Sequence, residues 1–179
     1  MSKRFSNKGR LIKADKPIKF HFNGVQFIGY QGDTLASALL ANGKLLLGRS
    51  FKYHRPRGVV SSGPEEPNFL VNLGKDNFFE PNQRGTMTNI FEGLTATSQN
   101  HFPSLEFDFG EINSWLARFL PAGFYYKMFI HPRPFWKYIY EPLIRMSAGL
   151  GQAPKEKDGS TYEHFHAFYD VVVVGGGIA

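Results

Sequence analysis

Two stretches of this 179-residue chain hold residue types that bind ligands, and the first is its glycine-rich end. The four valines Val171–Val174 are followed by Gly175, Gly176 and Gly177. An apolar run of this kind is typical of a fully buried parallel strand. Gly-x-Gly directly after such a strand begins the fingerprint G-x-G-x-x-G, whose glycines let the backbone approach the pyrophosphate of a dinucleotide. We therefore predict that Gly175, Gly176 and Gly177 bind a dinucleotide cofactor in the intact protein.

The glycine fingerprint needs further parts to hold its ligand. A dinucleotide is also bound by the N-terminus of the following helix and by an acidic residue about 20 positions later. The sequence stops at Ala179, before either part. We expect these residues to be the N-terminal piece of a longer polypeptide, and to bind neither NAD nor FAD tightly on their own.

The second stretch is basic and aromatic, and we name residues 49–58 the basic–aromatic segment. Because guanidinium groups match phosphate and carboxylate oxygens, one interpretation is that this segment contacts an anion or an acidic partner. The alternative is a strand in which Phe51 and Tyr53 pack inward, while the cations are solvated or pair with Glu65 and Glu66. The cations have no acidic residue among them and are Arg49, Lys52, Arg55 and Arg57.

Other site chemistry is excluded or unsupported by the sequence. The chain has no cysteine, which excludes disulfides, a thiol nucleophile, and cysteine-ligated zinc or iron–sulfur clusters. His164 and His166 follow Glu163, but a zinc site needs three or four ligands and no further cluster is evident. No Ser/His/Asp set can be assembled from spacing. We predict neither a metal site nor a catalytic residue here.

The positive charge of the chain lies at its beginning. The formal net charge is +6, and the first nineteen residues, with seven cations and one anion, carry all of it. A basic arm on a neutral remainder argues against nucleic-acid binding. No apolar run approaches the ~20 residues of a membrane helix, and the N-terminus lacks the apolar region of a secretory signal. We expect a cytoplasmic protein that contacts neither nucleic acid nor membrane.

The elements that must position these residues begin with a strand, a turn and a helix. Ile18–Phe22 alternates apolar and polar residues, as a half-buried strand does. Asn23-Gly24 is typical of a two-residue hairpin turn, and a return strand begins at Val25. Thr34 is placed to cap a helix that ends before Gly43. A hairpin followed by a helix is the opening of a β-grasp domain.

The rest of the chain divides by composition. We predict further strands at Leu45–Leu47, Phe69–Leu73 and Thr86–Phe91, and mainly helical structure from Glu111 to Leu150. The aromatic side chains of that helical part are expected in a core or at a subunit interface. The predicted fold class is α+β, with a basic arm at 1–16, a β-grasp domain at 17–100, a helical aromatic-rich segment at 101–148, a linker at 149–162, and the truncated first strand of a Rossmann domain at 163–179.

This order of elements resembles the plant-type [2Fe–2S] ferredoxin domain. In that family a hairpin leads to a helix that opens at Gly-Asp-Thr-Leu, as at Gly32–Leu35 here. The cluster-binding loop with its C-x4-C-x2-C run follows. The corresponding stretch here is the basic–aromatic segment, which has no cysteine. The resemblance therefore implies the ferredoxin-like fold without its iron–sulfur cluster.

A more specific resemblance is to the alpha subunits of heterotetrameric sarcosine oxidases. The matching stretches are GDTLASALLANG at 32–43, GRSFKYHRPRG at 48–58, EEPN at 65–68, SQN at 98–100, GFYYK at 123–127, YEP at 140–142 and the glycine motif at the end. The resemblance implies a cysteine-free ferredoxin-like domain ahead of an NAD-binding Rossmann domain. It also implies a partner subunit that carries FAD, an FMN near the subunit interface, and sarcosine as substrate of the complex.

Two hypotheses for function follow. The first is a structural, assembly region of the alpha subunit of a multi-subunit, flavin-dependent sarcosine oxidase, in which the catalytic parts lie outside these residues. The second is a stand-alone β-grasp module that binds an anionic partner through the basic–aromatic segment.

Overall fold

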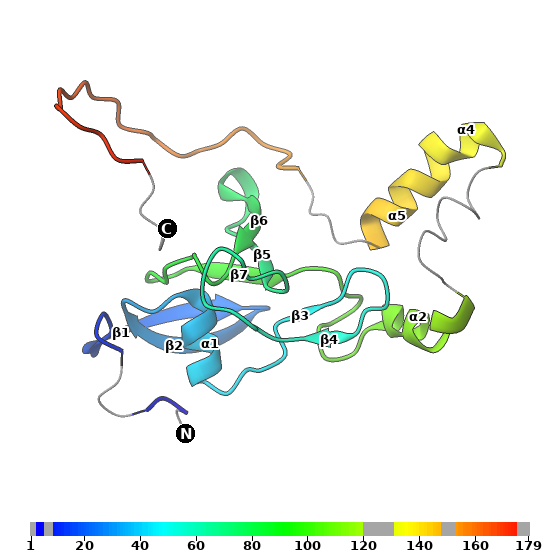
Figure 1. Cartoon of the computed structure of the whole chain (residues 1–179), viewed down its shortest axis with the longest axis horizontal. Coiled ribbons are helices and arrows are strands. Elements are labelled where there is room, and N and C mark those ends of the chain that lie inside the picture. Colours follow the sequence, from blue (N-terminus) through cyan, green and yellow to red (C-terminus); the bar gives the residue numbers. More distant parts are fainter. Residues whose placement is uncertain (1–2, 6–8, 120–130, 148–152, 175–179) are drawn as a thin grey trace.

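The computed structural model describes residues 3–5, 9–119, 131–147 and 153–174 (Figure 1). The fold is α+β, and its main sheet has five strands in the order β2-β1-β7-β5-β6. Strand β1 runs parallel to β7, and the other neighbouring strands are antiparallel. The strands of this sheet are β1 (Lys13–Phe22), β2 (Val25–Gln31), β5 (Leu70–Leu73), β6 (Glu80–Arg84) and β7 (Thr95–Ser98).

The predicted hairpin is confirmed. Phe22 pairs with Val25, so that only Asn23 and Gly24 form the turn. Both have positive φ, 50° and 79°, which is the conformation that a tight turn between twisted strands requires. Strand β1 begins at Lys13, earlier than predicted, with an irregularity in its pairing before Pro17. The sheet therefore includes the last residues of the predicted basic arm.

Helix α1 (Leu35–Ala41) is also as predicted. The Thr34 hydroxyl accepts a hydrogen bond from the Ser37 N–H at 3.2 Å, and the Ser37 hydroxyl accepts one from the Thr34 N–H at 3.0 Å. These reciprocal bonds satisfy two donors that the helix start would otherwise leave unpaired. Gly43, with φ of 77°, follows the end of the helix. The cap thus fixes where the helix starts.

The core lies where α1 packs on the main sheet. Leu35, Ala38 and Leu39 of α1 are completely buried, and the Phe22 and Phe69 rings meet edge to face with centroids 6.0 Å apart. Apolar surface removed from water on this scale is the main stabilising contribution to a domain of this size. The buried apolar residues are Phe20, Phe22, Leu35, Ala36, Ala38, Leu39, Leu47, Phe69, Val71, Ile90, Leu94, Ala96 and Leu105.

Two predicted strands are wrong. Residues 45–47 form no strand, and pairing starts instead at β3 (Gly48–Arg49), which pairs with β4 (Pro56–Arg57) in a separate two-stranded sheet. Residues 86–91 form a turn with one isolated bridge, because the N–H groups of Met87 and Thr88 bond back to the Arg84 carbonyl. The strands at this place in the chain are β6 before it and β7 after it.

The predicted helical segment contains short helices in its described parts. Its aromatic side chains Phe135, Trp136 and Tyr138 are exposed rather than in a core, while Phe124, Tyr125 and others of the predicted group lie outside the described residues. The elements are η2 (Phe109–Glu111), α2 (Ile112–Trp115), η3 (Ala117–Phe119), α4 (Arg133–Phe135), η4 (Trp136–Tyr140) and α5 (Glu141–Ser147), and a short η1 (Asp76–Phe78) precedes β6. In the part of the chain that the structure describes, no helix has both the length and the apolar character of a membrane span.

Residues 153–174 form neither helix nor strand. The strand predicted at Val171–Val174 is not formed, and these side chains are 68% to 94% exposed. A run of this kind needs parallel neighbours on both sides, and none of the described strands pairs with it. Gly175, Gly176 and Gly177 lie outside the described residues.

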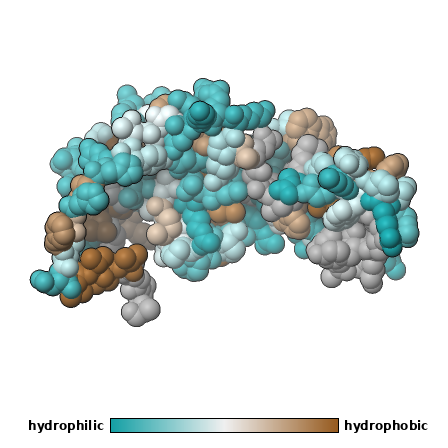
Figure 2. Space-filling model, turned by 90° about the horizontal axis from the view of Figure 1, so that it is seen from above, coloured by the Kyte–Doolittle hydropathy of each residue, from teal (hydrophilic) through white to brown (hydrophobic). Residues whose placement is uncertain are grey.

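Figure 2 shows a surface that is mainly hydrophilic on the viewed face, with hydrophobic side chains in separate patches.

Candidate functional site

Several stretches singled out in the sequence meet around one pocket of about 640 Å³. It lies between the β3–β4 hairpin, the loop before β5 and the end of β7, and it includes parts of the 48–58, 65–68 and 98–100 motifs. We name it the amide pocket because four of its side chains are carboxamides. Its lining residues are Gly48, Arg49, Ser50, Phe51, Arg57, Pro67, Asn68, Leu70, Asn82, Gln99 and Asn100.

The basic–aromatic segment forms a hairpin rather than a single strand. Gly48 pairs with Arg57, and Arg49 pairs with Pro56. The turn between them is closed by Ser50 N–H to Arg55 O at 2.9 Å and by His54 N–H to Ser50 O at 3.0 Å. Phe51 at the start of the turn is 51% exposed. The expectation that Phe51 packs inward is therefore wrong, because the chain reverses direction within the segment.

Arg49 is the buried cation of this segment, with a side chain only 3% exposed. Its Nε donates to the Leu105 carbonyl at 3.0 Å, and its Nη2 donates to the Glu106 carbonyl at 3.2 Å. Its Nη1 donates to the His54 carbonyl at 2.9 Å and to Glu111 Oε2 at 3.0 Å. The guanidinium fork thus joins the hairpin to residues 105–111, and most of its donors are already used.

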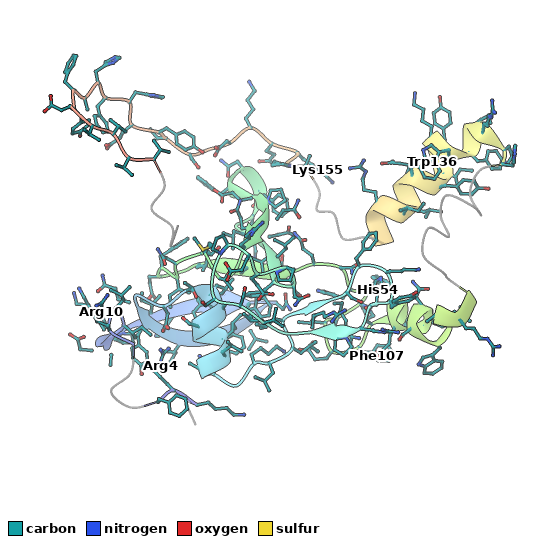
Figure 3. The ribbon with its side chains drawn as sticks, viewed as in Figure 1. Arg4, Arg10, His54, Phe107, Trp136 and Lys155 are labelled. Atoms are coloured by element: carbon teal, nitrogen blue, oxygen red, sulfur yellow. The ribbon has the colours of Figure 1, made fainter. Side chains whose placement is uncertain are left out.

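Two further side chains complete this connection: Asp108, whose Oδ2 lies 4.0 Å from Arg49 Nε, and His54, which is labelled in Figure 3 beside the β3–β4 hairpin. The His54 Nδ1 lies 2.6 Å from Asp108 Oδ2, and the other carboxylate oxygen accepts from the N–H groups of Phe102 and Gly110, each at 3.0 Å. Gly110 is needed here because a Cβ would lie 2.2 Å from His54 Nδ1. We name Arg49, His54 and Asp108 the buried polar network.

The Asp108 carboxyl is held in its ionised form. Its burial raises the pKa, but the hydrogen bonds from Phe102, His54 and Gly110 outweigh that cost, so the pKa lies below its ordinary value. A buried carboxylate is stable only when paired and hydrogen-bonded in this way. This role of Asp108 is not among the sequence-based predictions, because His54 and Asp108 are 54 positions apart. An isolated histidine and an isolated aspartate carry no local pattern.

The other three cations of the segment lie in different surroundings. The Lys52 Nζ and the Arg55 Cζ each lie 4.8 Å from the centre of the Tyr53 ring, and Arg55 Nε also donates to the Ser114 hydroxyl at 3.3 Å. Arg57 is exposed and lines the amide pocket. Within the described residues its side chain has no hydrogen bond, ion pair or ring contact. The structure thus separates the four cations that the sequence grouped.

Glu65 and Glu66 do not pair with these cations, so this part of the alternative interpretation is wrong. Glu66 is 1% exposed, and its carboxylate accepts from the N–H groups of Val60, Ser61 and Asn68 at 2.7 to 2.8 Å. Burial raises the pKa of Glu66, but these backbone hydrogen bonds lower it by more, so the pKa lies below its ordinary value. Glu66 therefore fixes the loop that forms one wall of the pocket.

Carboxamides brace the opposite wall of the pocket. Gln99 Nε2 donates to Asn72 Oδ1 at 2.7 Å and to Asn82 Oδ1 at 3.0 Å. Asn100 Nδ2 donates to the Ser50 carbonyl at 2.8 Å, which ties the end of β7 to the β3–β4 hairpin. The pocket is thus built from distant segments that are held together by polar side chains.

The described residues offer little for catalysis or metal binding. Among them no group of three or more His, Asp or Glu side chains could hold a metal ion, and His164 and His166 are exposed. Ser98 Oγ lies 2.8 Å from His101 Nε2, but Ser98 is buried and His101 Nδ1 has no hydrogen-bond partner. A nucleophile oriented through a third group therefore cannot be built there.

Comparison with known proteins finds one family whose match covers nearly all of the main sheet. Residues 15–101 match the family described as "2Fe-2S iron-sulfur cluster binding domain". The residues of this chain do not fit the cluster, since the whole sequence lacks cysteine and thiolates are the usual cluster ligands. Of the buried polar network, Arg49 and His54 lie within the matched residues 15–101, whereas Asp108 follows them.

Curated relatives cover nearly the whole chain. It is 52% identical to the sarcosine oxidase subunit alpha of Rhizobium meliloti (strain 1021), over 98% of this chain and 18% of that protein. The subunit alpha of Corynebacterium sp. (strain U-96) is 28% identical over 96% of this chain and 13% of its own length, and that of strain P-1 is 29% identical over 88% and 12%. The chain therefore spans less than a fifth of each relative.

Among solved structures, the chain is similar to L-proline dehydrogenase from P. horikoshii. The two are 23% identical with a TM-score of 0.38, over 52% of this chain and 18% of that one.

Proposed function

The chain belongs to the family of sarcosine oxidase alpha subunits, and from this premise we propose that its residues form a structural, assembly region of such a subunit. The complex would oxidise sarcosine to glycine by oxidative demethylation. The observation that carries the proposal is the 52% identity to a sarcosine oxidase alpha subunit over 98% of the chain. The role of this region would be to hold the nucleotide-binding part and the other subunits in position.

The proposed organisation follows from the order of elements. The ferredoxin-like domain at 17–100 would be the rigid body, which is supported by its continuous core and by the buried polar network. The segment at 101–148 would be an interface, which is supported by its exposed aromatic side chains. The linker at 149–162 would lead to the nucleotide-binding domain that starts at 163–179.

We further propose that Gly175, Gly176 and Gly177 contact NAD in the intact subunit, while FAD and FMN belong to other parts of the complex. When bound, a dinucleotide would supply hydride chemistry, and these glycines would contribute close backbone approach to its pyrophosphate. The residues of this chain would position and support the site without taking part in a chemical step. The lack of cysteine argues against an iron–sulfur cluster.

Deletion in the intact subunit tests the assembly role. A subunit that lacks residues 1–148 would be produced together with its partner subunits and analysed by size-exclusion chromatography. We expect loss of the hetero-oligomer, while the remaining polypeptide still retains NAD. A complete complex with full sarcosine oxidase activity would overturn the proposal.

Nucleotide titration tests the cofactor assignment. Calorimetry with NAD and FAD would be run on residues 1–179 and on the intact subunit. We expect binding by the intact subunit alone, and loss of it on Gly177→Val. Micromolar binding by residues 1–179 would place the nucleotide site on another surface and contradict the assignment to the glycines.

A further inference from the structure

We propose that the amide pocket binds a carboxylate side chain from a later segment of the same subunit, with Arg57 as its counter-ion. This inference rests on the proposed function, since it assigns a contact through which the region would hold the rest of its subunit. Arg57 is exposed at the pocket, and within the described residues it has no side-chain partner. No Asp or Glu is among the lining residues, so the site favours an anionic group.

The surroundings of Arg57 suit a peptide better than a phosphate. Phosphate sites are usually made of several backbone N–H groups at a helix N-terminus or a glycine-rich turn, and none of the described helices contributes a residue to this pocket. Carboxamides both donate and accept hydrogen bonds, as peptide groups do. Pro67, Leu70 and Phe51 add apolar surface against which the stem of an acidic side chain would pack.

Two observations favour a segment of the same subunit over another subunit. The chain spans 18% of the length of its Rhizobium relative, so most of such a subunit lies outside these residues. The later part of the chain also contacts this domain, because the Gly159 N–H donates to the Asn77 carbonyl of η1 at 3.0 Å, and η1 directly precedes β6, which contributes Asn82 to the pocket.

The weakness of a single ion pair also favours a segment of the same subunit over another subunit. One exposed Arg–carboxylate pair is worth too little to hold two separate proteins together. Within one polypeptide the local concentration reaches the millimolar range, and a weak contact then becomes sufficient. A single unpartnered guanidinium in a pocket therefore fits an intramolecular contact.

Hydrogen exchange in the intact subunit tests the contact. Backbone amides of residues 65–72 and 98–102 should exchange about 10-fold more slowly in the intact subunit than in residues 1–179, because the covered pocket opens less often. Arg57→Glu should remove this protection, and the matched control Arg55→Glu, which changes a cation of the same segment outside the pocket, should preserve it. Equal exchange in the two proteins, or equal effects of the two variants, would overturn the inference.

Cross-linking identifies the occupant. In Arg57→Lys, a carbodiimide should join the new amine to an Asp or Glu in the later part of the same subunit, and Arg55→Lys should not give that product. A link to another subunit, or protection of the pocket in residues 1–179 by inorganic phosphate alone, would contradict the inference. Assembly of the wild-type subunit is measured separately, so failure of the proposed function is distinguishable from failure of this contact.

Discussion

Residues 13–43 and residues 44–58 are neighbours in the chain, but different interactions hold them. In the first region, apolar side chains such as Phe20 and Leu39 are fully buried, and one cap at Thr34 closes the helix. In the second region, a buried arginine bonds to the Leu105 and Glu106 carbonyls, and a histidine bonds to the Asp108 carboxylate. The first region depends on local sequence and burial, whereas the second depends on polar groups from a distant segment.

This difference shows that polar contacts with a later segment hold the 49–58 hairpin, in a chain that has no cysteine to bind a cluster. A metal cluster would hold a loop through metal–ligand bonds to several cysteine thiolates. Here Arg49, His54 and Asp108 connect the loop to the segment that follows the sheet. Removing Asp108 would leave the His54 ring and two backbone N–H groups buried without their acceptor, which is costly.

The largest expected effect is that of Asp108→Ala. It leaves the His54 ring and two backbone N–H groups without their acceptor, which should lower the free energy of unfolding by about 4 kcal/mol. Urea denaturation measures the change, with the exposed Asp15→Ala as control, for which we expect less than about 0.5 kcal/mol. Equal small effects of the two variants would show that the network contributes nothing to stability.

Leu39→Ala should be nearly as destabilising for a different reason. Leu39 is fully buried in the core, so the truncation loses apolar burial and leaves a cavity at a cost of about 3 kcal/mol. The exposed Leu45→Ala should change the free energy of unfolding little. A cost below about 1 kcal/mol for Leu39→Ala would mean that α1 repacks freely against the sheet.

Acid should weaken the contacts of the second region in particular, because they depend on the ionised Asp108 carboxylate. The pKa of Asp108 is lowered in the folded state, so its contribution to stability is complete above the ordinary value near 4 and is lost as pH falls through the lower folded value. Denaturation at a series of pH values should show a smaller loss of stability below about pH 4 for Asp108→Asn than for the wild type. Parallel pH profiles would contradict the role of the Asp108 charge.

The smallest effect is expected at the helix cap. Thr34→Ala removes the side-chain oxygen that accepts from the Ser37 N–H, and should cost about 1 kcal/mol. Thr34→Ser keeps the oxygen and serves as the matched control. Thermal denaturation that does not distinguish the two variants would argue against the capping role.

The same contrast explains what the sequence could predict. The Asn23-Gly24 turn and the Thr34 cap act over a few residues, and both were found from the sequence. Strand β6 was missed because it contains Pro81, which is tolerated there since β6 lies at the sheet edge. Strand β7 was missed because its sequence TATS has a single apolar residue, although it lies in the middle of the sheet.

The candidate site was predicted in composition but not in arrangement. The basic–aromatic segment was found, and two interpretations were open for all four of its cations. Their separation into the buried Arg49 and the exposed Arg57 depends on Asp108, Leu105 and Glu111, which lie far along the chain. Charge alone does not reveal which cation has a buried partner, so a sequence pattern cannot make this distinction.

Hydrogen exchange of single backbone amides tests the central claim most directly, namely that the buried polar network holds the β3–β4 hairpin in place. In Asp108→Asn, the amides of His54 and Arg55, which bond to Ser50, should exchange faster, while those of Ala38 and Asn42 at α1 keep their wild-type rates. Unchanged rates at His54 and Arg55, or an equal increase at both regions, would contradict the claim.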